Sequence, residues 1–128
     1  MILLDSTFLI DVLRGRPETE KILNSSETLL TTQINMYEII TGIFLQKQTA
    51  NQFSRVKDFF DQIVVLSLDD DAVLKAGELN ATLIKKGEII GDCDCLIAGI
   101  ALSKNISTII TKNKKHFEKI EGINVISY

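Results

Sequence analysis

Residues 2–11 read Ile-Leu-Leu-Asp-Ser-Thr-Phe-Leu-Ile-Asp, a short apolar strand that runs directly into an acid. A carboxylate at the end of a buried strand is costly to fold unless a cation or a hydrogen-bond donor offsets its lost hydration. Asp, Ser and Thr in a row are also strong helix caps. Asp5 therefore has two interpretations: a cap of the first helix, or one member of a site whose other residues supply its partners.

The rest of the chain repeats this alternation of apolar strand and helix. Strands rich in Ile, Val, Leu and Thr are predicted at residues 2–5, 28–32, 63–67, 107–111 and 123–127. Helix-length segments separate them. The pattern predicts an α/β fold of three layers (α/β/α), with a mostly parallel, about five-stranded central sheet and right-handed crossovers.

Each crossover has its own helix signals. The first is expected to hold helices at residues 7–14 and 17–24, and the third the longest helix, from an acidic start at Asp69 to a left-handed stop at Gly87. Apolar stripes mark the helices of the second crossover, namely Tyr37, Ile40 and Phe44, then Phe53, Val56 and Phe60. A further helix follows Asp92 and is expected to carry Ile97, Ala98 and Ala101 inward.

Length and composition place the chain among globular proteins. A chain of 128 residues that is 45% hydrophobic is expected to form one domain over residues 1–128. No apolar run reaches the roughly 20 residues of a membrane span, and no signal peptide is recognisable, so we expect a cytoplasmic protein without membrane contact. Cys93 and Cys95 lie too close together in sequence to join distant segments and are expected to be reduced thiols. The net charge of −3 argues against a general nucleic-acid coat.

Acidic side chains follow several of the predicted strands. Asp5 follows the first strand, Glu38 lies just past the second, and Asp69 to Asp71 follow the third. Asp92 and Asp94 open a helix whose start should lie at the same edge. Ligands of open α/β sheets bind outside the carboxyl ends of the strands, so we expect these acids to converge although they are far apart in sequence.

Each acid also has a purely structural interpretation. Asn35-x-x-Glu38 matches the capping-box pattern of a helix start. Gly42 lies one turn beyond Glu38, which leaves that helix face with little bulk and open to a close approach. Asp92 and Asp94 are two residues apart and point in nearly opposite directions on a helix, so at most one faces the site and the other is expected to be the cap.

Taken together, the acids predict a metal site. Carboxylates within about 4–6 Å of one another repel strongly and raise one another's pKa unless a divalent cation neutralises them. Oxygen ligands without a His or Cys cluster favour Mg²⁺ or Mn²⁺, with coordination sites left for phosphate oxygens. Such a site hydrolyses phosphodiesters by orienting a water and offsetting the charge of the transition state.

Four stretches occur together in order: Leu4-Asp5-Ser6-Thr7-x-Leu9-Ile10-Asp11, Asn35-x-x-Glu38-x-x-x-Gly42, Asp92-x-Asp94-x-Leu96-Ile97-Ala98, and Thr111-x-Asn113-x-x-His116-Phe117. In this order and spacing the chain resembles the PIN-domain family over essentially its whole length. The length is similar to that of the small VapC-type toxins of prokaryotic toxin–antitoxin pairs. The resemblance implies a PIN-like α/β fold, Mg²⁺- or Mn²⁺-dependent cleavage of RNA, homodimerisation, and inhibition by a cognate antitoxin.

The resemblance also implies roles for particular residues. Asp5 is similar to the first metal ligand, Glu38 to the second acid, and Asp94 to the third acid and principal ligand. Thr7 resembles the small polar residue that supports the site. The fourth acidic position, two residues after Thr111, is Asn113 here, which brings no charge and puts a second metal in doubt. Asp92 would supply part of that charge if it does not cap the helix.

The remaining polar residues carry weaker predictions. Lys112, Lys114 and Lys115 follow the fourth strand, where they would hold RNA phosphates if they are not simply solvated. Arg14 and Arg16 would do the same or meet an antitoxin. His116 is expected on a turn away from the acids, in a structural role.

Three other functions stay open at this point. A housekeeping RNA-processing nuclease of the same family would share the site. A receiver-like phosphoacceptor domain of a signalling system would use Asp69, Asp70 or Asp71, but it would leave Glu38 and Asp94 without a task. In a purely structural binding module the acids would all be caps.

Overall fold

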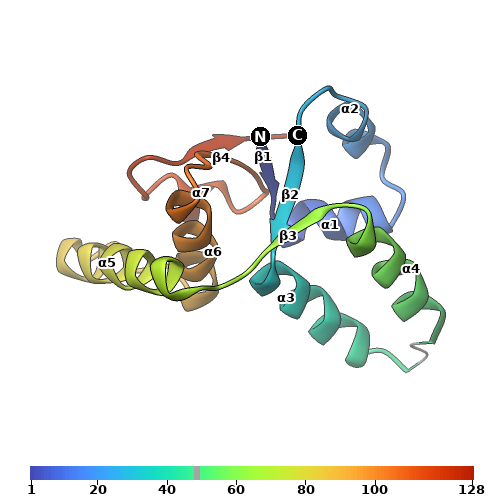
Figure 1. The fold of residues 1–128 in the computed structure, drawn as a ribbon, viewed down its shortest axis with the longest axis horizontal. Helices are drawn as coiled ribbons and strands as arrows, with labels where there is room; N and C mark the ends of the chain where they lie inside the picture. The colour runs from blue at the N-terminus through green and yellow to red at the C-terminus, as the bar shows by residue number, and fades with distance from the viewer. Residues whose placement is uncertain (48–49) are drawn as a thin grey trace.

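The computed structural model describes residues 1–47 and 50–128, and within them five strands form a single sheet (Figure 1). The strands are β1 (Ile2–Leu4), β2 (Leu29–Thr32), β3 (Val64–Leu66), β4 (Thr108–Ile110) and β5 (Asn124–Ile126). Their order across the sheet is β3-β2-β1-β4-β5, and every neighbouring pair is parallel. The predicted α/β class and parallel sheet are confirmed, and all five strands lie within the predicted ranges.

Helices cover both faces of the sheet, as the alternation of elements predicts. They are α1 (Ser6–Leu13), the 3₁₀ turn η1 (Pro17–Thr19), α2 (Glu20–Leu23), α3 (Gln33–Phe44), α4 (Ala50–Asp61), α5 (Asp70–Lys86), α6 (Asp92–Ser103) and α7 (Lys114–Phe117). Figure 1 shows α1, α3 and α4 on one side of the sheet and α5, α6 and α7 on the other. The chain builds β1, β2 and β3 outward and then returns to β4 on the other side of β1. This reversal makes the carboxyl ends of β1 and β4 the topological switch point, where open α/β sheets bind ligands.

Alternation along the strands divides the core between the two faces. Leu3 and Ile109 pack with α5, α6 and Phe117 of α7, whereas Leu4 and Ile110 pack with α1, α3 and α4. Successive strand residues point to opposite faces, so both faces of β1 and β4 are buried. Polar groups at the ends of these two strands are therefore held in a rigid, water-poor frame.

The long helix α5 follows its sequence signals closely. Asp69 caps it by accepting a hydrogen bond from the Ala72 amide at 2.9 Å, and Gly87 ends it with φ +70°. Its predicted inner face packs on α6 so tightly that a Cβ at Gly99 would lie 2.6 Å from the Ala76 Cβ. This close contact fixes the position of α6, which carries Asp94.

Helix α3 does not bury the stripe that its sequence suggests. Tyr37 and Phe44 are 62% and 67% exposed, and the buried residues are Asn35, Ile39 and Ile43. The reason is that the buried hydrogen bonds of Asn35 fix the rotation of the helix. The most conspicuous apolar stripe of α3 is left on the surface, whereas Val56 and Phe60 of α4 are buried as predicted.

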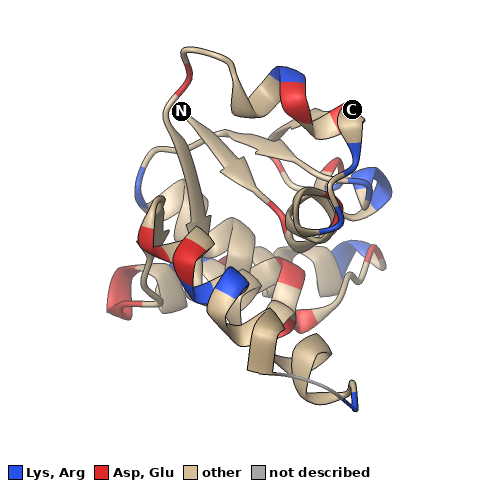
Figure 2. Cartoon of the chain, turned by 90° about the vertical axis from the view of Figure 1, so that its right-hand side faces the viewer, with Lys and Arg blue, Asp and Glu red and all other residues tan. Residues whose placement is uncertain are grey.

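The surface charges are mixed. In Figure 2 basic segments alternate with acidic ones over several elements, in keeping with the small net charge. Both cysteines are free, as expected, with Cys93 half-buried and Cys95 buried. Among the described helices none is both long and apolar enough to cross a membrane.

Candidate active site

Asp5 lies at the carboxyl end of β1 and is only 2% exposed. It occupies the N-cap position of α1, but its side chain makes no capping hydrogen bond. Instead Oδ1 accepts a hydrogen bond from Asn35 Nδ2 at 3.0 Å, and Oδ2 accepts one from the Thr111 hydroxyl at 2.5 Å. The capping interpretation of the Asp5 side chain is therefore wrong, and the carboxylate is held by donors from two other elements.

Asn35 is the centre of these contacts, and the sequence pattern does not predict a role for it in the site. It is fully buried, and its Nδ2 also donates to Ser6 Oγ at 2.9 Å. Its Oδ1 accepts from the Thr32 hydroxyl at 2.7 Å, and Thr32 caps α3 by accepting from the Asn35 amide. The side-chain amide of Asn35 thus fixes α3 against the start of α1. In the sequence, the only sign of this role is a polar residue one turn after a threonine that caps the helix.

Glu38 reaches the same network through Ser6. The Ser6 hydroxyl donates to Glu38 Oε1 at 2.8 Å, and the Glu38 side chain is half-buried. The capping-box interpretation is wrong, because Thr32 is the cap of α3 and Glu38 lies in its second turn. A continuous path of hydrogen bonds therefore joins Glu38 to Asp5 through Ser6 and Asn35.

Asp94 is the inward-facing acid of α6. It is buried, whereas Asp92 is exposed, so the two point apart as predicted. The cap of α6 is Gly91, which corrects the expectation that Asp92 would fill that position. Asp92 lies in the first turn, where its charge suits the helix dipole.

His116 lies against Asp94, contrary to the expectation that it stands apart from the acids. Its Nδ1 is 2.6 Å from Asp94 Oδ2. Phe117 is fully buried in the core cluster that contains Ile97 and Ala98 of α6, and this packing brings the single turn α7 against α6. His116 is thereby placed beside the acid.

The acids share one electrostatic environment. Burial raises the pKa of Asp5, and the charge of Asp94 adds to this, while hydrogen bonds from Thr111 and Asn35 act in the opposite direction. Burial also raises the pKa of Glu38, the Ser6 hydrogen bond opposes the rise, and the charges of Asp5 and Asp94 reinforce it. Ionising Asp5 and Glu38 together is therefore unfavourable without a cation.

The donor set fits a hard divalent cation, although it is not a preformed cage. No three His, Cys, Asp or Glu side chains of residues 1–47 and 50–128 converge closely enough to enclose a metal. Glu38 is turned toward Ser6 and Asp94 toward His116, so the compact triad expected from the sequence is not formed. A small divalent cation needs only one or two carboxylates, because waters and phosphate oxygens complete its coordination.

Thr7 and Thr111 join α1 to the end of β4. Their hydroxyl oxygens are 3.2 Å apart, and Thr7 Oγ1 also accepts from the Lys112 amide at 2.9 Å. Thr111 accepts from the Asn113 amide at 2.9 Å. Asn113 itself is exposed at the N-cap of α7 and its side chain makes no capping bond. The structure brings Thr7 and Thr111 to Asp5, but it does not join the Asn113 side chain to an acid.

The three lysines after β4 differ in their partners. Lys112 Nζ is 2.6 Å from Asp11 Oδ2, and the lysine side chain is 58% exposed. Lys114 pairs with Glu118 at 3.4 Å on the surface, and Lys115 is exposed. The Lys114 side chain is 54% exposed, so the three lysines differ in their partners and not in their exposure.

Asp69 has a separate task. Besides capping α5, its Oδ2 lies 2.5 Å from Lys104 Nζ, and this partner and the cap hold the pKa of Asp69 below its usual value. No hydrogen bond joins Asp69 to Asp5 in the described residues. The acids after β3 are therefore used to anchor α5, which disfavours the receiver-like alternative.

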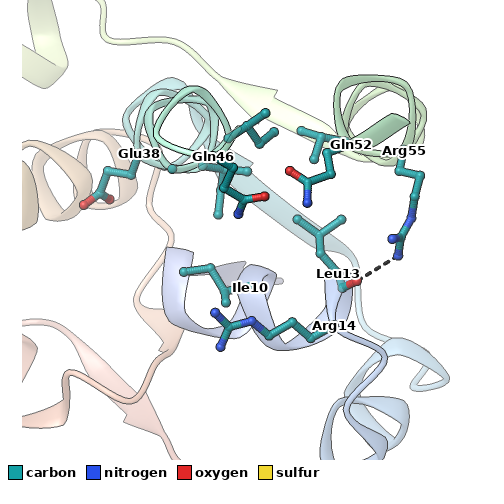
Figure 3. Close-up of a pocket in the computed structure, with 11 residues that line it drawn as sticks. Ile10, Leu13, Arg14, Glu38, Gln46, Gln52 and Arg55 are labelled. Carbon is teal, nitrogen blue, oxygen red and sulfur yellow. Dashed lines mark hydrogen bonds between the residues drawn. The ribbon is translucent and has the colours of Figure 1, made fainter. Parts of the chain in front are cut away.

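A hollow of about 380 Å³ borders Glu38 between α1, α3 and α4 (Figure 3). Ile10 and Leu13 of α1 face it, and Arg14 lies at its edge. Gly42 also lines it, and a Cβ there would meet nothing within 4 Å, as the sequence suggested for this helix face. Of the three acids, Glu38 therefore lines a groove of mixed apolar and polar character, and Asp5 and Asp94 do not.

Comparisons with known proteins agree with this fold. The family model of the PIN domain matches residues 2–123. The chain is 31% identical over 129 residues to ribonuclease VapC1 of Methanocaldococcus jannaschii, covering 99% of this chain and 86% of that protein. It is 28% identical over 125 residues to the tRNA(fMet)-specific endonuclease VapC of Salmonella typhimurium, covering 96% of this chain and 94% of that one.

Solved structures of similar fold come from toxin–antitoxin complexes. VapBC2 of Rickettsia felis, bound to a DNA fragment from its promoter, matches with a TM-score of 0.88 at 25% identity, covering 100% of this chain and 99% of that chain. DNA-bound VapBC of Salmonella typhimurium matches with a TM-score of 0.87 at 28% identity, covering 98% and 96%. The matches extend over the whole sheet and both helical layers.

Proposed function

This chain belongs to the PIN domain family, and from that premise we propose that it is an endoribonuclease that hydrolyses RNA phosphodiester bonds as the toxin of a toxin–antitoxin pair. Its curated relatives are named ribonucleases and endonucleases, and they match over nearly the full length of this chain. Its structural relatives are toxins in complex with antitoxins.

One observation carries the proposal: neither the buried Asp5 nor the half-buried Glu38 is paired with a fixed cation. Neutral donors hold Asp5 and Glu38, and among the described residues no lysine or arginine pairs with either. Burial and mutual repulsion raise both pKa values. This arrangement is expected of carboxylates that bind a removable cation and not of structural ion pairs.

Nucleases of this family depend on a divalent metal, and we assign it here to Mg²⁺ or Mn²⁺. Asp5 and Asp94 would be its principal ligands, with Glu38 as the third acid. A bound divalent cation would offset charge on the phosphate and lower the pKa of an attacking water. Thr7, Thr111 and Asn35 would orient Asp5. Asn113, at the fourth acidic position, would accept a hydrogen bond from water without adding charge.

The partners follow from the same assignment. RNA is the substrate, and Lys114 and Lys115 are placed to meet its phosphates. A cognate antitoxin is the inhibitor, and the groove beside Glu38, with Arg14 at its edge, supports a protein partner. The exposed apolar side chains Tyr37, Phe44 and Leu45 support the expectation that a twin subunit or an antitoxin helix covers part of the surface. The site of action would be the cytoplasm.

The decisive experiment is cleavage of a mixed RNA pool by the wild type and by Asp5→Asn and Asp94→Asn. We expect metal-dependent cleavage by the wild type and a loss of at least about 100-fold in each variant, because each removes a charged ligand. Equal cleavage by all three would contradict the assignment. Arrest of growth on expression, relieved by a co-expressed antitoxin, would distinguish a toxin from a housekeeping nuclease.

A further inference from the structure

A second buried acid lies on α1, away from the metal-binding acids, and it is fully partnered. Asp11 is 7% exposed. Its Oδ2 is 2.6 Å from Lys112 Nζ and accepts a hydrogen bond from the Tyr128 hydroxyl at 2.6 Å. Lys112 Nζ also lies 5.2 Å from the centre of the Tyr128 ring, within the range of a cation–π contact. Three residues distant in sequence thus form one cluster, which we call the Asp11 cluster (Asp11, Lys112 and Tyr128).

The Asp11 cluster is tied directly to the threonines that hold Asp5. The Tyr128 hydroxyl lies 3.2 Å from the Thr7 carbonyl oxygen. The Lys112 amide donates to Thr7 Oγ1 at 2.9 Å, and Lys112 directly follows Thr111, whose hydroxyl donates to Asp5. Both ends of Lys112 are therefore fixed on α1: its backbone to Thr7 and its side chain to Asp11, one helical turn further on.

We propose that the Asp11 cluster is a positioning device for the nuclease reaction, which fixes the segment after β4 so that Thr111 aims its hydroxyl at Asp5. This inference rests on the proposed function of the site. Asp11, Lys112 and Tyr128 are positioning residues, because none of them contacts Asp5, Glu38 or Asp94 directly. Lys112 is thereby assigned to the ion pair with Asp11 and not to RNA phosphates.

The burial of Asp11 separates this ion pair from ordinary surface ion pairs. In Lys57–Asp61 of α4 the two side chains are 77% and 63% exposed, whereas in Lys112–Asp11 the lysine is 58% exposed and the aspartate only 9%. The Tyr128 ring also packs edge-on against Phe8 of α1, with centroids 4.9 Å apart. The cluster is built into the packing of α1, so its geometry is transmitted to Thr7 and Thr111.

Tyr128→Phe tests the proposal with the smallest change, since it removes one hydroxyl and keeps the ring. We expect kcat for RNA cleavage to fall about fivefold with KM within about twofold, because the substrate contacts are intact and only the alignment of Thr111 is lost. Thr82→Val, which removes one exposed hydroxyl of α5, is the control. Asp11→Asn should lower kcat more strongly, with Asp61→Asn as its surface control.

Hydrogen exchange gives a readout that does not need RNA. In Tyr128→Phe the amide of Lys112, which donates to Thr7, should exchange at least about tenfold faster, while the amide of Ile109 in β4 stays unchanged. If Tyr128→Phe shows this faster exchange but the wild type cleaves no RNA, the proposed function is overturned, and the role of the cluster in fixing Thr111 still stands. Unchanged exchange and unchanged kcat in Tyr128→Phe would overturn the proposed positioning role of the Asp11 cluster.

Lys112→Met separates positioning from RNA binding. The positioning role predicts a lower kcat, an unchanged salt dependence of RNA binding, and no additional loss when it is combined with Asp11→Asn, because the two act as one unit. A raised KM and a weaker salt dependence at unchanged kcat would overturn the proposal and assign Lys112 to a phosphate contact.

Discussion

Asp5 and Asp11 lie near the two ends of the same short helix, and both are almost fully buried. Their hydrogen-bond partners and the directions of their pKa shifts are opposite. Asp5 has only neutral donors, and burial raises its pKa. Asp11 has a lysine and a tyrosine, and these hydrogen bonds lower its pKa. The protein supplies Asp11 with a cation of its own, whereas no lysine or arginine of the described residues pairs with Asp5.

This difference distinguishes a functional acid from a structural one where burial alone does not. A buried carboxylate that is already neutralised within the protein contributes to order. A buried carboxylate with neutral donors and other acids nearby keeps an unsatisfied demand for positive charge. The comparison therefore explains why Asp5 is proposed as a metal ligand and Asp11 as a positioning residue.

Removing the hub of the Asp5 network should have the largest effect on stability. Asn35→Leu keeps the branched shape of the side chain but removes its hydrogen bonds to Asp5, Ser6 and Thr32, so we expect a loss of about 3 kcal/mol in the free energy of unfolding. Urea denaturation measures it. Asn51→Leu, at an exposed position of α4, should change stability by less than about 0.5 kcal/mol. A similarly small effect at Asn35 would show that Asp5 does not depend on this network.

The two acids should also give the metal-free protein opposite dependences on pH. A carboxyl whose pKa is higher in the folded protein than in the unfolded chain stabilises the fold at low pH, and this contribution is lost as pH rises through the raised pKa. This holds for Asp5 and Glu38. For Asp11, whose pKa is lowered, the contribution is present above the unfolded value and is lost as pH falls through the lowered pKa.

Denaturation of metal-free variants across pH 2 to 8 separates these contributions. Asp5→Asn should remove part of the loss of stability on the high-pH side, and Asp11→Asn should remove part of the loss on the low-pH side. Asp61→Asn serves as the exposed control. Identical changes in Asp5→Asn and Asp11→Asn would mean that the two acids are not in opposite environments.

The smallest expected effect concerns the lysines outside the Asp11 cluster. Lys114→Ala and Lys115→Ala should each reduce the slope of log affinity for RNA against log salt concentration by about 0.7, the change expected for one phosphate contact to a single strand. Lys57→Ala on α4 is the matched control. If the slope changes for Lys112→Met but not for these two variants, Lys112 contacts RNA phosphates and Lys114 and Lys115 do not, which contradicts the roles proposed here.

The sequence predicts the fold well because the strands are short, apolar and clearly separated by helix signals. It also names the acids, since Asp5, Glu38 and Asp94 follow from their positions relative to the strands and from the family resemblance. What it does not predict is how they are held. The links of Asn35 to Asp5 and of Ser6 to Glu38 join different elements, and they depend on the approach of α3 to α1.

The errors have a common physical cause. The apolar stripe of Tyr37 and Phe44 faces outward because the buried polar contacts of Asn35 determine the rotation of α3. His116 lies at Asp94 because the neighbouring Phe117 is drawn into the core. Contacts that depend on tertiary packing leave no periodic signal in the sequence, so a pattern of apolar residues cannot reveal them.

The most direct test of the account is Mn²⁺ binding to the RNA-free protein, measured by the electron paramagnetic resonance signal of free Mn²⁺. We predict that Asp5→Asn weakens binding at least about tenfold, because it removes a ligand, whereas Asp11→Asn changes it less than about threefold, because that acid already has its cation. Binding that is unchanged in Asp5→Asn, or lost in Asp11→Asn, would contradict the assignment of the metal to the unpaired acids.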